Sequence, residues 1–218
     1  MKTKRRFAFL AFDWDGTLAD STAEIVSAIE ASCADLGIPI PANGSARQVI
    51  GLGHRDAIRA VAPSLAVADQ PRFAERYRHH YLTGAIPLFD GVPDLLAELN
   101  GRGFLLGVAT GKSRSGLDRA FTQYGVGGYF VASRCADEGF AKPNPDMLFS
   151  LMDRVGVTPD QTLMIGDTTH DLQLARNAGV QALGVSYGAH TEAELSALSP
   201  LAIVQSIAQL RQWLVEHG

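Results

Sequence analysis

The sequence predicts an α/β protein in which a parallel sheet alternates with helices and a small helical domain is inserted. Short apolar runs, typical of strands buried on both faces, alternate with helical repeats over most of the 218 residues. Residues 19–85 break this alternation, because they hold helical repeats and no clear strand pattern. We therefore expect a Rossmann-like three-layer core, formed by residues 1–18 and 86–218, and an inserted helical domain at 19–85.

Length and composition are those of an ordinary globular protein. A net charge of −4 and scattered arginines leave no basic field for a nucleic-acid backbone, so we expect no nucleic-acid partner. The first apolar run ends too early, at Asp13, for a signal peptide, and no stretch is long enough to span a membrane. Cys33 and Cys135 lack metal-ligand spacing and are typical of buried thiols, although their spacing leaves a disulfide open. We expect a cytoplasmic protein without a membrane partner.

The first strand is predicted at Phe7–Phe12 and runs directly into two acids, Asp13 and Asp15. Because they lie two residues apart, an extended chain points both carboxylates to the same side of the turn. Two such charges repel unless a cation lies between them or one acid holds a proton. The pair therefore indicates a metal site, an acid/base pair or both, and the alternative is a solvated turn.

Helical repeats fill the inserted stretch. Ser21 and Glu24 have the spacing of a capping box, which predicts a helix start at this point. Further helices are predicted around residues 49–61, where the glycines of 51–53 interrupt the repeat, and around residues 73–81.

The alternation of strands and helices resumes after residue 86. Ser113 and Thr191 are predicted to cap two of the helices. The later strands are predicted at Phe104–Ala109, Tyr129–Val131, Thr162–Ile165, Ala182–Val185 and Leu201–Val204.

Reactive or phosphate-binding side chains follow several of these strands. They are Asp13, Asp15, Thr110, Lys112, Asp167 and Asp171, with Lys142 on a proline-flanked loop between them. The carboxyl ends of parallel strands meet at one edge of a sheet, so we expect these groups to converge. Several acids, a lysine and a hydroxyl suit a phosphate held together with a hard, oxygen-binding cation, and nothing in the pattern indicates zinc.

Lysine is scarce in this chain, which has fifteen arginines and four lysines. Lys2 and Lys4 lie in the N-terminal tail, so Lys112 and Lys142 are the two left for the folded body. Since arginine is used elsewhere, these two positions are predicted to require a compact ammonium group.

Four segments carry a family resemblance: Asp-Trp-Asp-Gly-Thr at 13–17, Ala-Thr-Gly-Lys at 109–112, Ala-Lys-Pro-Asn-Pro at 141–145 and Gly-Asp-Thr-Thr-His-Asp at 166–171. In this order and spacing they resemble the four motifs of the haloacid dehalogenase-like hydrolases. Each motif is weak alone, but four in order beside predicted strand ends are specific. The helical insertion after the first motif is similar to that of the subfamily with phosphoglycolate phosphatases and β-phosphoglucomutases. Trp14 replaces the Phe or Met that is usual there.

The resemblance implies a phosphatase that works through a phosphorylated aspartate. Asp13 would be the nucleophile, and Asp15 would protonate the leaving alcohol and then activate water. Lys142 and Thr110, with the Gly111 amide, would hold the phosphoryl oxygens. For Thr110 the alternative is a polar residue that only terminates a strand.

The same resemblance implies a Mg²⁺ cofactor. Its ligands would be the Asp13 carboxylate, the backbone carbonyl of Asp15 and the Asp167 carboxylate. Asp171 would support the site through water or through Lys142, and its alternative role is helix capping.

Other prominent side chains receive structural interpretations. We interpret Lys112 as a solvated neighbour of the site and His170 as a surface or supporting histidine. We interpret the stripe of Tyr77 and Tyr81 as core packing.

The inserted domain is expected to act as a cap that closes over the site. The segment 51–55 is predicted to touch the substrate, because its glycines permit a mobile turn and His54 and Arg55 suit a second anionic group; the alternative is an ordinary helix junction. A small phosphorylated metabolite is the expected partner, with phosphoglycolate ahead of a sugar phosphate or a nucleotide. The chain is expected to be a monomer or a homodimer.

Other reactions of the same superfamily remain to be compared. A dehalogenase would need neither Asp15 nor Mg²⁺, and a phosphonatase would need a cap lysine, yet no lysine lies between Asp13 and Lys112. A sugar-phosphate mutase of the β-phosphoglucomutase type stays open, since it differs by excluding water from the phosphorylated intermediate. A non-enzymatic sensor of phosphate ligands is the remaining alternative.

Overall fold

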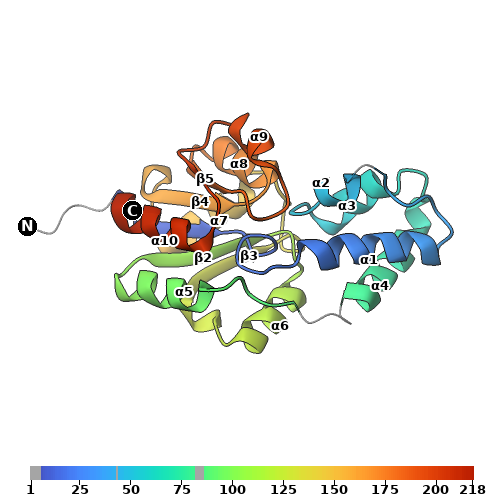
Figure 1. Ribbon diagram of the computed structural model, residues 1–218, viewed down its shortest axis with the longest axis horizontal. Coiled ribbons are helices and arrows are strands. Elements are labelled where there is room, and N and C mark those ends of the chain that lie inside the picture. The colour runs from blue at the N-terminus through green and yellow to red at the C-terminus, as the bar shows by residue number, and fades with distance from the viewer. Residues whose placement is uncertain (1–5, 43, 82–85) are drawn as a thin grey trace, which may run out of the picture.

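The computed structural model describes residues 6–42, 44–81 and 86–218, which form a larger and a smaller lobe (Figure 1). The larger lobe holds six parallel strands in the order β3-β2-β1-β4-β5-β6. The strands are β1 Phe9–Phe12, β2 Leu105–Thr110, β3 Phe130–Cys135, β4 Thr162–Gly166, β5 Gln181–Val185 and β6 Ile203–Val204. This confirms the predicted parallel sheet.

Helices cover both faces of the sheet, as the three-layer prediction requires. They are α5 Val92–Gly101, α6 Arg114–Tyr124, α7 Asp146–Val155, α8 Thr169–Asn177, α9 Glu192–Ser196 and α10 Ile207–His217. Short 3₁₀ turns lie at Val67–Asp69, Gly127–Tyr129 and Pro159–Gln161. Side chains alternate along β1: Leu10 and Phe12 pack in the core cluster with α5 and α10, whereas Phe9 and Ala11 pack in the cluster with α7 and α8. All four are buried, because β1 has helices on both faces.

The position of β1 determines where the first acids lie. β1 pairs with β2 on one side and with β4 on the other, and Phe12 is in register with Val108 and Ile165. The residues that follow the three strands therefore leave the sheet side by side at its carboxyl edge, where open α/β sheets bind ligands.

The smaller lobe is the predicted helical insertion. Its helices are α1 Thr22–Asp35, α2 Ser45–Gln48, α3 His54–Val61 and α4 Gln70–Tyr81. They surround an apolar cluster of their own, in which Ile29, Ile58 and Phe73 are buried. In Figure 1, α1 begins beside the loops at the sheet edge and runs out along the smaller lobe, with α4 packed next to it. The predicted end of the insertion, residue 85, lies outside the described residues.

Strand ends differ from the predictions mainly at the sheet edges. β3 was predicted over 129–131 but extends to Cys135. The apolar pattern covers only Phe130 and Val131 of its six residues, because β3 is an edge strand and carries the half-buried Ser133 and Arg134. The capping predictions for Ser113 and Thr191 are confirmed, since each side chain accepts a backbone hydrogen bond in the first turn of its helix.

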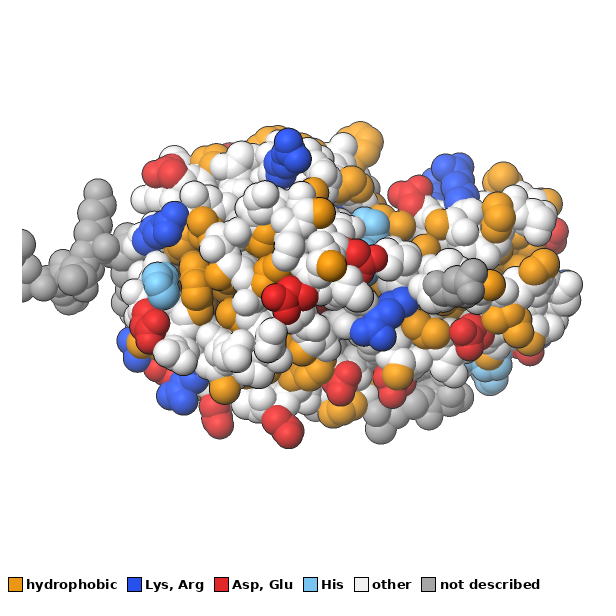
Figure 2. All heavy atoms as spheres, turned by 45° about the horizontal axis from the view of Figure 1, so that its top comes forward, with side chains coloured by type: hydrophobic (Ala, Val, Ile, Leu, Met, Phe, Trp, Pro, Cys, Tyr) orange, Lys and Arg blue, Asp and Glu red, His pale blue; other side chains and the backbone are white. Residues whose placement is uncertain are grey.

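The surface and the cysteines agree with an ordinary globular fold. On the face in Figure 2, Lys and Arg side chains lie apart from one another among acidic ones, so this face has no continuous basic stripe. Cys33 and Cys135 are both buried and unpaired. Within the described ranges, no helix combines the length and apolarity that a membrane crossing needs.

Candidate active site

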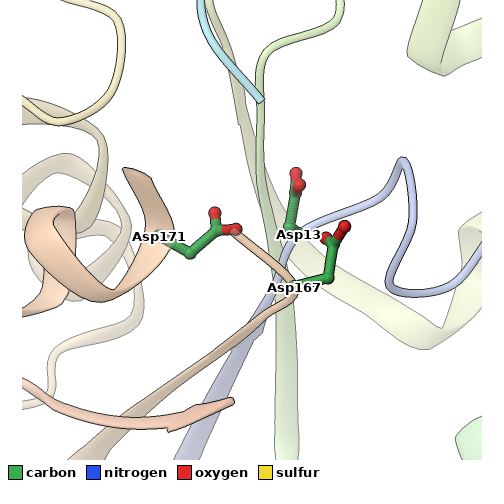
Figure 3. A group of neighbouring side chains, drawn as sticks. All are labelled: Asp13, Asp167 and Asp171. Carbon is green, nitrogen blue, oxygen red and sulfur yellow. The ribbon is translucent and has the colours of Figure 1, made fainter. Parts of the chain in front are cut away.

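Three carboxylates converge at the carboxyl edge of the sheet (Figure 3). Asp13 follows β1, Asp167 follows β4 and Asp171 lies in the first turn of α8. One oxygen atom from each lies within 4.8 Å of those of the other two. All three side chains are fully buried. The convergence is the one expected from acids that follow neighbouring parallel strands.

The Lys142 ammonium lies among these carboxylates. Its Nζ atom is 2.8 Å from Asp13 Oδ1 and 2.6 Å from Asp171 Oδ1, and the residue is 1% exposed. Burial alone would lower the pKa of Lys142, but the attraction of Asp13 and Asp171 outweighs it and raises that pKa. The lysine is therefore a fixed positive charge beside the candidate nucleophile.

Neighbouring groups fix the other two carboxylates. The Thr17 hydroxyl donates to Asp167 Oδ1 at 2.8 Å, and the Ala189 amide donates to Asp167 Oδ2 at 2.7 Å. Asp171 accepts from Lys142 with Oδ1, and its Oδ2 accepts from the Thr168 amide and hydroxyl in the capping box of α8. Asp171 thus contacts Lys142 and also caps α8, with both oxygens engaged.

The donor set fits a divalent cation. Three carboxylates and one ammonium leave a formal charge of −2 in a buried space. Asp13 Oδ2 has no partner in the described part of the chain. Burial raises the pKa of Asp13 well above its usual range and that of Asp167 to about 7. Ionising both carboxylates is therefore costly unless a further positive charge lies beside them. An all-oxygen set suits a hard cation rather than zinc.

Asp15 lines the cleft at the boundary between the lobes and contacts groups from both sides of it. Its Oδ1 accepts from the Ser21 hydroxyl at 2.8 Å and from the Tyr81 hydroxyl at 3.2 Å. Lys112 Nζ lies 3.0 Å from Oδ1 and 3.1 Å from Oδ2. The capping box of Ser21 and Glu24 was therefore a wrong prediction: Ser21 precedes α1, but its side chain makes no capping bond because its hydroxyl is used by Asp15.

One other structural interpretation was wrong, and a second was incomplete. Lys112 is not a solvated neighbour, because its side chain is only 10% exposed and pairs with Asp15. Tyr81 packs beside Tyr77, as a core stripe would, yet its hydroxyl reaches Asp15. The scarcity of lysine could have indicated a specific role for Lys112. A helical repeat of tyrosines, in contrast, does not indicate which group a tyrosine hydroxyl contacts. His170 is half-buried and bonds to the carbonyl of Gln48, as a supporting histidine would.

The smaller lobe, which is the predicted cap, lies directly against the loop after β2 that is predicted to bind phosphate. Thr110 is buried at the end of β2, and Gly111 faces the carbonyls of Gly51 and Leu52 so closely that a Cβ atom at Gly111 would lie 2.7 to 2.8 Å from them. A Cβ atom at Gly53 would lie 2.7 Å from that of Ala141, beside Lys142. The segment 51–53 therefore forms a seal between the cap and the loop after β2, next to Lys142.

We expect Gly111→Ala to lower kcat/KM about 10- to 100-fold, because the added methyl prevents the cap loop from seating, an overpacking cost of about 1–3 kcal/mol. The backbone amide of residue 111 is retained, so a lower kcat/KM would reflect only the poorer seating of the cap loop. The matched control is Gly128→Ala, where the methyl meets no atom within 4 Å. Steady-state phosphate release measures both, and equal activity of the two variants would contradict the seal.

The predicted cap residues border a cleft between the lobes. This cleft has a volume of about 970 Å³ and is lined by Asp15, Lys112, His54 and Arg55, among others. His54 lies edge-on to Tyr77, at 5.2 Å between ring centroids, and burial with the nearby Arg78 lowers the pKa of His54. At neutral pH this leaves Arg55 as the cation of the pair. Contact of either residue with substrate stays a prediction.

Residues 10–185 match the model of the family described as haloacid dehalogenase-like hydrolase. The chain belongs to this family. The relative named "Probable phosphatase IndB" of Dickeya dadantii (strain 3937) is 35% identical over 207 residues, which cover 91% of this chain and 90% of the relative. The phosphoglycolate phosphatase of Vibrio vulnificus (strain CMCP6) is 31% identical over 222 residues, which cover 95% and 96% respectively.

Solved structures share the fold of this haloacid dehalogenase-like hydrolase. A hydrolase from Pseudomonas syringae matches with a TM-score of 0.87 at 22% identity, covering 96% of this chain and 98% of that one. The family match and the phosphatase relatives make this chain a phosphatase, which is a phosphoric monoester hydrolase. Phosphatases of the family generally use a divalent metal ion, in line with the three buried carboxylates.

Proposed function

We propose that this haloacid dehalogenase-like phosphatase hydrolyses a small, phosphoglycolate-like phosphomonoester in two steps, through a phosphorylated Asp13. The observation that carries the proposal is the pairing of Asp13 with Lys142. One oxygen of Asp13 faces the ammonium, while Oδ2 has no partner in the described ranges and is available to attack phosphorus. A second acid, Asp15, lines the cleft where a leaving group would lie.

In the first step, Asp13 Oδ2 bonds to phosphorus and the bond from phosphorus to the alcohol oxygen breaks. Asp15 gives its proton to that oxygen as the alcohol leaves. In the second step, Asp15 accepts a proton from water, whose oxygen attacks phosphorus and releases inorganic phosphate from Asp13. Lys142, the Thr110 hydroxyl and the Gly111 amide hold the phosphoryl oxygens during both transfers.

We assign the cofactor as Mg²⁺. It would be held by the carboxylates of Asp13 and Asp167 and by the backbone carbonyl of Asp15, and when bound it neutralises charge on the phosphoryl oxygens. Asp171 would act through Lys142, since its own oxygens are already engaged. The excess of negative charge in the buried cluster supports this assignment.

We assign the choice of substrate to the cap, residues 19–85. The cap closes on the core, which is formed by residues 1–18 and 86–218. His54 and Arg55 begin α3 at the cleft wall, where Arg55 could meet a second anionic group such as a carboxylate. The phosphoglycolate phosphatase relative supports a small acidic phosphomonoester.

The test is phosphate release from a panel of small phosphomonoesters, including phosphoglycolate, hexose phosphates and a nucleoside monophosphate. Each is measured with Mg²⁺ and again with excess EDTA. We expect Mg²⁺-dependent release, fastest with phosphoglycolate, and loss of release in EDTA that added Mg²⁺ restores. No release from any member, with β-hexose 1-phosphate converted to the 6-phosphate instead, would replace the hydrolase with a mutase. No reaction in either assay would favour a non-enzymatic sensor of phosphate ligands.

A further inference from the structure

Lys112 and Tyr81 make contacts that the two-step reaction above does not use. Lys112 belongs to the loop after β2 in the core, whereas Tyr81 is the last residue of α4 in the cap. Lys112 Nζ is 2.7 Å from the Tyr81 hydroxyl and 4.7 Å from the centre of its ring. Both groups reach the carboxylate of Asp15. A core residue and a cap residue therefore meet on the same acid.

Together with the Ser21 hydroxyl, which donates to Oδ1 at 2.8 Å, these contacts fix the orientation of the Asp15 carboxylate. Lys112 lies at nearly equal distances, 3.0 and 3.1 Å, from its two oxygens, which limits rotation of the carboxylate plane. The Tyr81 hydroxyl, at 3.2 Å from Oδ1, adds a donor from the cap side. Asp15 is 9% exposed, and what remains exposed lies at the cleft wall.

The two donors are themselves held in place. Tyr77 lies one helical turn before Tyr81 and stacks on it, with ring centroids 5.6 Å apart and planes 15° apart. The Lys112 side chain is 10% exposed, so its ammonium has little freedom to point elsewhere. Because Tyr81 comes from α4, the full set of donors exists only while the cap is seated on the core.

We propose that Lys112 and Tyr81 are positioning residues that hold the Asp15 carboxylate toward the leaving group when the cap is seated. The proposal rests on the proposed function, in which Asp15 protonates the leaving alcohol. Neither residue needs to touch the substrate. Their joint contact links closure of the cap to the orientation of the proton donor, so closure completes the site as well as excluding water.

The experiment compares two substrates that differ in their need for a proton. An alkyl phosphomonoester releases a poor leaving group that must be protonated, whereas p-nitrophenyl phosphate releases a stable phenolate. For the alkyl ester we expect Tyr81→Phe to lower kcat/KM about 10-fold and Lys112→Met about 100-fold, within the range of general acid catalysis. For p-nitrophenyl phosphate both losses should stay near threefold or less.

Two further variants complete the set. Lys112→Arg should lose less than Lys112→Met, because a guanidinium can still donate to both carboxylate oxygens. Tyr129→Phe is the matched control: it removes the hydroxyl of a partly buried tyrosine in the core, at a position outside the lining of the cleft. It should behave as wild type with both substrates.

Equal losses with both substrates, or losses confined to KM, would overturn the positioning role. Thermal unfolding of each variant checks the fold; should Lys112→Met fail to fold, Tyr81→Phe removes a single oxygen atom and still decides the matter. The proposed function fails separately, if wild type releases no phosphate from either ester in the presence of Mg²⁺. In that case Asp15 has no leaving group to protonate and both ideas fall.

Discussion

Asp13→Asn is expected to lower turnover at least about 10⁴-fold, because the amide keeps the shape of the side chain but cannot act as the nucleophile. The fold should survive. Without added metal, the change reduces the formal charge of the buried cluster from −2 to −1, so the melting temperature should be unchanged or slightly higher.

Two measurements decide this prediction. Phosphate release at saturating Mg²⁺ gives the loss of turnover, and thermal unfolding in metal-free buffer gives the change in stability. Asp153→Asn, on an exposed position of α7, is the matched control and should retain full activity. Substantial turnover by Asp13→Asn would rule out a phosphorylated Asp13 as the intermediate.

Lys142→Met is expected to reduce both activity and stability. It keeps most of the side-chain volume but removes the ammonium that lies 2.8 Å from Asp13 and 2.6 Å from Asp171. Loss of a preorganised positive group at a phosphoryl site lowers kcat about 10²- to 10³-fold. Loss of one partner of a buried ion pair costs about 3 kcal/mol or more. For a chain of this length that is about 6–12 °C in melting temperature.

Lys112→Met is the comparison for stability. Lys112 pairs with one carboxylate near the cleft and is partly exposed, so its removal should cost clearly less than removal of Lys142. Kinetics with a good substrate and thermal unfolding in EDTA give both quantities. A Lys142→Met enzyme with wild-type kcat/KM would contradict the role proposed for this lysine, and an unchanged melting temperature would contradict its pairing.

Much of the core could be predicted because its signals are local. The apolar run of β1 marks a strand buried on both faces, and Asp13 follows it at the sheet edge. The parallel order then explains why Asp167, far away in the sequence, lies beside Asp13. Only Phe130 and Val131 of the edge strand β3 could be predicted, since a strand with one neighbour does not need a continuous apolar run.

From the amino-acid pattern we could predict the alternation of strands and helices, the insertion after the first strand, and the order of the acids, the hydroxyl and Lys142 at the strand ends. These features repeat at the period of a strand or a helix, or follow directly from the end of one. Only the packed fold shows that Ser21, Tyr81 and Lys112 meet at Asp15 and that the cap loop covers Gly111. Such contacts join the tips of side chains from separate elements. They depend on how the two lobes pack, and no repeat along the chain encodes the distance between side chains of different lobes.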